Sequence, residues 1–113
     1  MHSNNKEETS EKIRQRVNNA RKIQIERYRE YGIFSNSELT PNLIERYCVL
    51  NDESKAILEQ AFNKLGLSAR AYGRILKVAR TIADLSEEKD IKINHLTEAI
   101  QYRSLDRKFW GNN

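Results

Sequence analysis

Apolar residues recur every three or four positions along most of the chain, which is the spacing of helices that turn one side toward a core. The first such stripe contains Ile13, Val17, Ala20, Gln24, Tyr28 and Tyr31. Ser10 is placed to cap the N-terminus of this segment. Gly32 suits the left-handed conformation that ends many helices. The pattern therefore predicts a helix over residues 10–31.

Capping residues mark two further helices in the middle of the chain. Thr40 is a good N-cap, and Pro41 fits the first helical position because no intrahelical bond is lost there. Asn51 or Asp52 caps the next helix, which Gly66 ends. These signals predict a short second helix and a longer third one.

Two more helices are expected in the C-terminal half. Ser68 caps the fourth, which runs to about Leu85. A solvated turn and a short extended piece at residues 91–93 follow. Asn94 caps the fifth helix, which should end near Ser104. This helix is expected to bury Leu96, Ala99 and Ile100, with Tyr102 as a further candidate.

The chain has 113 residues, with only four glycines and one proline to interrupt helices. This length is typical of one domain with one modest core. We therefore expect an all-α fold, a small five-helix bundle over residues 10–113. Residues 1–9 are polar and are expected to form a flexible N-terminal segment.

Charge and composition limit the partners and the kinds of site that we expect. The net charge of +4 permits a nucleic-acid partner without requiring one. Cys48 is the single cysteine and is expected to be a buried thiol rather than a nucleophile, while His2 and His95 are too few and too far apart for a metal site. No apolar run reaches membrane-spanning length and no signal peptide is evident, so a cytoplasmic protein without a membrane partner is expected.

The fourth helix has two contrasting sides. Its apolar side contains Tyr72, Ile75, Leu76, Ala79, Ile82 and Ala83. Arg70, Arg74 and Lys77 fall within about 60° of one another on the opposite side. Periodicity alone favours a solvated face for them. However, the helix dipole disfavours a cation in the first turn, so Arg70 is best explained if an anion binds beside it.

The segment LSARAYGRILKVARTIADL, residues 67–85, resembles the C-terminal domain of magnesium-chelatase-like AAA+ ATPases. The similarity continues at residues 95–107 and in the first helix, and it covers nearly the whole chain from Ser10 to Trp110. Its ARTIADL segment favours the competence-associated branch of the family, which acts on DNA, over the chelatase branch. Gly73 departs from the family, which usually has a polar side chain there, so any role of that side chain is in doubt.

The resemblance implies the helical lid of a ring-forming ATPase. A core upstream would carry the phosphate loop GxxxxGK[ST] and an acidic metal-binding segment, and neither motif occurs in these residues. The chain alone is therefore expected to bind no cofactor and to have no activity, whereas the full-length parent would be an ATPase that uses ATP and Mg²⁺. The implied partners are the upstream core, neighbouring subunits of a homo-oligomeric ring, expected to be a hexamer, and DNA.

Arg70 matches the sensor 2 arginine of AAA+ lids, which reaches the γ-phosphate, so the resemblance makes it a catalytic and nucleotide-binding residue in the full-length protein. Arg74 is a candidate for a second phosphate contact, a contact with a neighbouring subunit, or solvated surface. Phe109 and Trp110 either pack back on the bundle or dock against the core.

Two alternatives remain open. The first helix contains the basic residues Lys12, Arg14, Arg16, Arg21, Lys22, Arg27 and Arg29. A solvated, salt-bridged helix is the favoured interpretation of this pattern. The first alternative function is a stand-alone nucleic-acid-binding module that uses this helix. The second is the lid of a magnesium-chelatase ATPase subunit.

Overall fold

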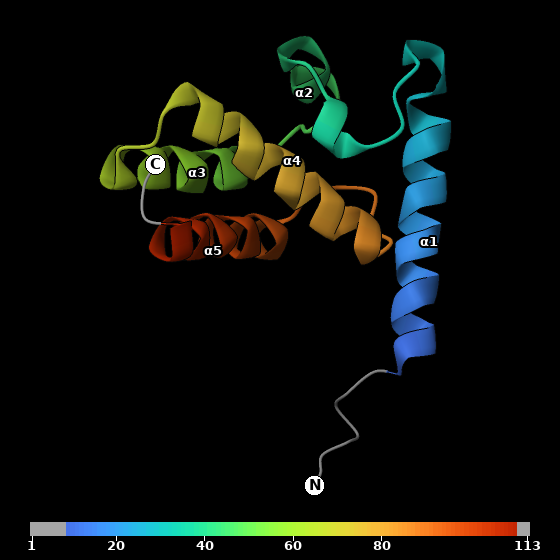
Figure 1. Cartoon of the computed structure of the whole chain (residues 1–113). Coiled ribbons are helices and arrows are strands. Elements are labelled where there is room, and N and C mark those ends of the chain that lie inside the picture. The colour runs from blue at the N-terminus through green and yellow to red at the C-terminus, as the bar shows by residue number, and fades with distance from the viewer. Residues whose placement is uncertain (1–8, 111–113) are drawn as a thin grey trace, which may run out of the picture.

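The computed structural model describes residues 9–110, and the side chains of residues 9–102. Within these residues it contains five α-helices and no strand, which confirms the predicted all-α bundle (Figure 1). The helices are α1 (Ser10–Arg27), α2 (Pro41–Tyr47), α3 (Asp52–Leu65), α4 (Ala69–Leu85) and α5 (Ile93–Trp110). Two short 3-10 segments, η2 (Arg29–Tyr31) and η3 (Asn36–Glu38), lie between α1 and α2.

The ends of α1 differ slightly from the prediction. The N-cap is Thr9 rather than Ser10, because the Thr9 hydroxyl accepts a hydrogen bond from the Lys12 backbone N–H at 3.1 Å. The α-helix ends at Arg27, and the chain continues through η2 to Gly32. Gly32 has φ 73°, the left-handed conformation expected there.

The predicted limits of α3 and α4 are confirmed. The Asn51 side chain accepts a hydrogen bond from Ser54 N–H at 2.8 Å, which caps α3. Gly66 ends α3 with φ 63°. The Ser68 hydroxyl then accepts from Ala71 N–H at 3.2 Å and caps α4.

The start of α5 corrects two predictions. The helix begins at Ile93, so Asn94 is not its cap and residue 93 is not extended. Lys92 occupies the capping position instead, because its carbonyl accepts from Leu96 N–H at 3.1 Å. The Lys92 N–H donates to Nδ1 of His95 at 2.9 Å. The His95 side chain thus accepts a hydrogen bond from the backbone N–H of the capping residue, as the glutamate of a capping box does.

The C-terminal end of α5 also differs. The helix continues beyond Ser104 to Trp110. Tyr102 is 53% exposed and does not join the core. The expected packing of Phe109 and Trp110 lies outside the described side chains. A flexible segment was predicted at residues 1–9, and its residues 1–8 lie outside the described residues.

Helix α4 is at the centre of the bundle (Figure 1). It packs against α1, α2, α5 and η3, while α3 packs against α5. The predicted apolar side of α4 faces the core, since Ile75, Leu76, Ala79 and Ala83 are all buried. The position of α4 fixes which of its residues can face solvent.

Helix α1 lies at the edge of the bundle, and its first half extends beyond the other helices (Figure 1). Ala20, Gln24 and Tyr28 are buried as expected. Ile13 and Val17 continue the same stripe but are 45% and 36% exposed, because the described part of the chain does not cover them. Among the described residues, no helix is long and apolar enough to cross a membrane.

Candidate functional site

A groove of about 780 Å³ lies between α2, the connector that follows it, and the first half of α4. Its apolar wall is formed by Leu39, Pro41, Ile44, Cys48, Val49, Leu50 and Leu76. Gly73 also lines it, and a Cβ built at this residue would lie 3.5 Å from Cδ1 of Ile44. Because Gly73 has no side chain, the space that a Cβ would fill beside Ile44 belongs to the groove.

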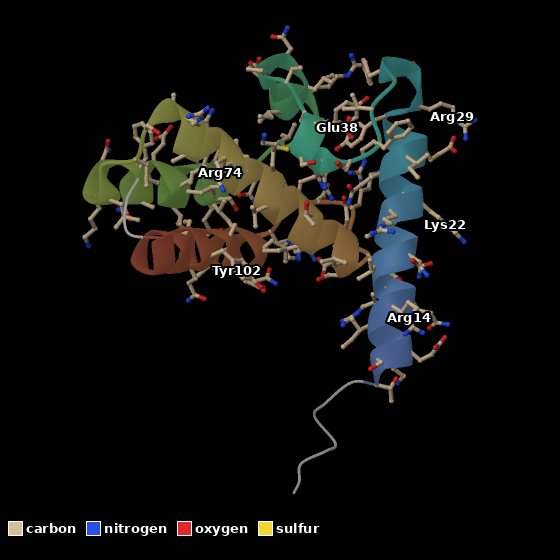
Figure 2. All side chains as sticks on the ribbon, viewed as in Figure 1. Arg14, Lys22, Arg29, Glu38, Arg74 and Tyr102 are labelled. Atoms are coloured by element: carbon tan, nitrogen blue, oxygen red, sulfur yellow. The ribbon has the colours of Figure 1, made fainter. Side chains whose placement is uncertain are left out.

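Three cations of α4 line the same groove, namely Arg70, Arg74 and Lys77. Arg70 is exposed in the first turn of the helix, and within the described part of the chain its side chain makes no hydrogen bond or ion pair. Arg74 is exposed one turn later (Figure 2). Lys77 is half-buried, and its Nζ donates to the Ser37 carbonyl at 3.4 Å. The structure thus brings the three predicted cations to one surface.

The electrostatics of the groove favour an anion. The first turn of α4 carries no acidic residue, and its backbone N–H groups lie at the positive end of the helix dipole. Lys55 adds a further positive charge to the lining, and Glu45 is its acidic member. A phosphate or carboxylate could therefore bind here to backbone N–H groups and guanidinium groups together.

The thiol of Cys48 lies in the apolar wall and is buried, as predicted. Burial raises the pKa of this thiol to about 11. The thiol is therefore protonated at neutral pH and unsuited to nucleophilic attack. Within the described residues, no group of three His, Cys, Asp or Glu side chains could hold a metal ion.

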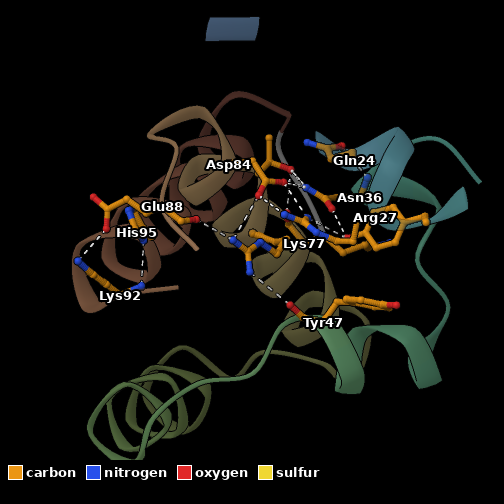
Figure 3. Close-up of polar contacts among 12 residues, drawn as sticks. Gln24, Arg27, Asn36, Tyr47, Lys77, Asp84, Glu88, Lys92 and His95 are labelled. Atoms are coloured by element: carbon orange, nitrogen blue, oxygen red, sulfur yellow. Dashed lines mark hydrogen bonds and ion pairs between the residues drawn. The ribbon is translucent and has the colours of Figure 1, made fainter. Parts of the chain in front are cut away.

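A buried polar network at the other end of α4 was not anticipated from the sequence (Figure 3). Asp84 is 1% exposed and accepts two hydrogen bonds from Arg27, at 2.8 Å and 3.1 Å. Arg80 Nη2 lies 3.2 Å from the same carboxylate. Asn36 Nδ2 also donates to Asp84 at 3.0 Å. Arg27, grouped with solvated cations in the sequence, is instead part of this network.

The network ties α1 to α4. Burial disfavours the charge on Arg27, but its hydrogen bonds to Asp84 and Tyr28 outweigh that effect, so its pKa is raised. The Tyr28 hydroxyl donates to Asn36 at 2.5 Å, and Asn36 N–H donates to Gln24 at 3.0 Å. The one signal in the sequence was the spacing of Arg80 and Asp84, four residues apart beside the apolar stripe.

Comparison with known proteins identifies the family. Residues 7–103 match the family model described as magnesium chelatase, subunit ChlI C-terminal. The competence protein ComM of Haemophilus influenzae is 51% identical over 88% of this chain, and the uncharacterized protein YifB of Escherichia coli is 42% identical over 88%. An uncharacterized protein of Mycobacterium tuberculosis is 30% identical over 85%.

The matched region is 19% of the length of each of these relatives. The chain therefore spans about a fifth of the proteins that it resembles. The family match covers all five helices except the end of α5, and it includes the basic groove and the buried network. The chain belongs to the magnesium chelatase ChlI C-terminal domain family.

Proposed function

We propose that this domain is the helical lid of an AAA+ ATPase that acts on DNA, and that Arg70 contacts the γ-phosphate of bound ATP. The observation that carries the proposal is the environment of Arg70. It is an exposed arginine in the first turn of α4, without a side-chain partner in the described part of the chain, on a groove that also contains Arg74 and Lys77.

The chemistry of a guanidinium suits this role. It stays charged at all working pH values and can bind two phosphate oxygens at once. Placed at the γ-phosphate, it would stabilise the charge that develops as the phosphoryl group is transferred. The contact would be lost when the phosphate leaves. The lid could then move relative to the core and relay the nucleotide state to the next subunit of a ring.

The other parts of the site would come from the rest of a longer protein. ATP and Mg²⁺ would be held by a core with a phosphate loop, and the lid would close over them. Arg74 would lie one turn further along the groove, as a second phosphate contact or as a contact with a neighbouring subunit. The similarity to a protein named for competence supports DNA as the substrate of the motor, in preference to the chelatase reaction that the family description names.

The test is single-turnover ATP hydrolysis by the full-length protein that carries this domain. Arg70→Ala should slow hydrolysis about a hundredfold, as loss of one charge-stabilising donor does. Arg70→Lys should rescue poorly, because an ammonium is a point charge without the two-pronged geometry. Arg29→Ala is the matched control, since Arg29 is an exposed arginine of η2 away from the groove.

The fold should survive the substitution, because Arg70 is exposed and faces away from the core. Thermal melts and sizing of the assembled ring would verify that each variant is intact. A folded and assembled Arg70→Ala protein with the wild-type rate would exclude the sensor role and make Arg74 the next residue to substitute.

A further inference from the structure

The net positive charge of the chain is concentrated in the first part of α1. Residues 10–23, here called the arm, contain five basic side chains and one acidic side chain. The whole chain has 20 and 16, so the remaining 15 basic and 15 acidic residues balance. The arm thus carries a net charge of +4, equal to that of the entire chain.

Most of the arm is also open to solvent. Every residue from Ser10 to Asn19 is exposed except Arg16, which is half-buried. This stretch extends beyond the other helices (Figure 1). A basic segment that projects from its domain can approach a large anion without a clash with the rest of the bundle.

The cations of the arm have a defined direction. Arg14, Arg21 and Lys22 fall within about 100° of one another around the helix axis, and Lys22 is about 180° from the mean direction of the buried Ala20 and Gln24. Figure 2 shows Lys22 on the side of α1 that faces away from the bundle, and Arg14 on the part of α1 that extends beyond the other helices. Lys22 therefore points directly away from the buried side, Arg14 and Arg21 flank it, and all three are exposed; the side of the arm that they occupy is here called its outward face.

The remaining outward residues are polar. Asn18 lies between the cations and Gln15 lies about 20° beyond Lys22. The exposed apolar residues Ile13 and Val17 lie toward the bundle side, and the exposed Ile23 lies about 100° from Lys22. Glu11 is the one acidic residue of the arm and pairs with Arg14 at 3.2 Å, with both side chains largely exposed. A pair of this kind contributes little and can be exchanged for another anion. The outward face thus combines cations with amides, as surfaces that bind nucleic acid do.

We propose that the outward face of the arm binds the phosphate backbone of duplex DNA. An α-helix about 21 Å long fits the major groove, whose width of about 12 Å matches the diameter of a helix. In that position Arg14, Arg21 and Lys22 face phosphates. An acidic protein surface would more readily use the side of Ile13 and Val17, because protein interfaces have an apolar centre. This inference rests on the DNA part of the proposed function and is independent of Arg70.

The experiment measures fluorescence anisotropy of a labelled DNA duplex titrated with the 113-residue chain, without ATP. We expect a dissociation constant of about 1–100 µM at low salt. Three phosphate contacts predict a slope near −3 in a plot of log affinity against log salt concentration. Affinity should therefore fall about 40-fold for a fourfold rise in salt concentration.

A matched pair of variants locates the surface. Lys22 and Lys64 are exposed helical lysines, and in the described part of the chain neither makes a side-chain ion pair or hydrogen bond. Lys22→Glu should weaken binding at least about tenfold and make the salt slope shallower by about one. Lys64→Glu, with the same change in net charge on α3, should bind within about threefold of wild type. Arg21→Gln is a second arm variant, and circular dichroism verifies that each variant is folded.

Three results would overturn the proposal. The first is that Lys22→Glu and Lys64→Glu weaken binding of the duplex equally. The second is that the separated single strand binds more tightly than the duplex. The third is that poly-glutamate at equal charge concentration displaces the DNA. The last result would point to an acidic protein partner instead. Because the assay contains neither ATP nor the rest of the longer protein, a negative result would not contradict the proposed role of Arg70. A negative result in the hydrolysis test would likewise not contradict DNA binding by the arm.

Discussion

Arg70 and Arg80 lie on the same helix, yet their surroundings give them different roles. Arg70 is exposed at the groove, whereas Arg80 is 6% exposed and donates to the Glu88 carbonyl at 3.1 Å. Arg80 also pairs with Asp84. A guanidinium that is already bound to protein oxygens cannot serve a nucleotide, so Arg80 holds the bundle together. The Arg70 guanidinium makes no hydrogen bond or ion pair in the described part of the chain, so at the start of the helix it can bind an external anion.

The raised pKa of Cys48 makes a residue-scale prediction. Burial favours the neutral thiol, so the reactive thiolate forms only as the pH rises toward about 11, above the ordinary value of 9.0. At about pH 8 the folded chain should contain roughly a hundredfold less thiolate than the unfolded chain. Alkylation by iodoacetamide should be slower by at least that factor, and should accelerate as pH is raised. The same chain in concentrated guanidinium is the control, and equal rates in both conditions would contradict the burial of this thiol.

At the scale of elements, α4 joins two distant features. Its first turn carries Arg70, and its last turn carries Asp84, which binds Arg27 of α1. The groove and the basic arm are therefore attached to opposite ends of one packed helix. A movement of α4 that follows the nucleotide would also carry α1, as long as the buried network holds the two helices together.

The strength of that attachment can be measured by substituting Asp84. Asp84→Ala leaves Arg27 and Arg80 without their shared carboxylate, and breaking a buried pair in this way costs about 3–5 kcal/mol of unfolding free energy. The control is Glu26→Ala, which removes a carboxylate from an exposed pair with Arg29 and should cost at most about 1 kcal/mol. Urea denaturation of the two variants compares these costs. A stability loss from Asp84→Ala no larger than that from Glu26→Ala would show that the network does not hold α1 on α4.

At the scale of the whole molecule, the groove would form one wall of the proposed nucleotide site. The groove supplies cations and a helix N-terminus, but the metal-binding carboxylates and the phosphate loop of an ATPase are not among its lining residues. In the proposed function, this domain would complete a site that another domain begins. Its contribution to catalysis would then depend on the geometry of closure.

This partial site predicts weak binding of ATP by the 113-residue chain alone. A few contacts from Arg70, Arg74 and the start of α4 cannot supply the approximately −8 kcal/mol of a micromolar complex, since they must also offset the entropy lost on association. Isothermal titration should detect no saturation at micromolar ATP. Micromolar affinity, retained with or without Mg²⁺, would mean that the chain contains a complete nucleotide site.

The sequence by itself determined the five helices and most of their limits. Capping and terminating residues such as Asn51, Gly66 and Ser68 act through bonds to their near neighbours, so their effect can be read without the fold. The cations of α4 could be placed on one face for the same reason, since three or four residues set the geometry of a helical turn. Two predicted caps were displaced by one or two residues, because a nearby residue caps the helix instead. These residues are Thr9 for α1 and Lys92 for α5.

Only the tertiary structure decided which side chains those faces meet. Arg27 looked like its solvated neighbours, and its burial depends on Asp84, 57 residues away in the sequence. Ile13 and Val17 have the spacing of core residues but lie beyond the end of the bundle. Periodicity gives the direction of a side chain around its own helix. Burial also depends on where the other helices end. A charged or apolar side chain is buried only if a neighbouring element extends far enough to pack against it.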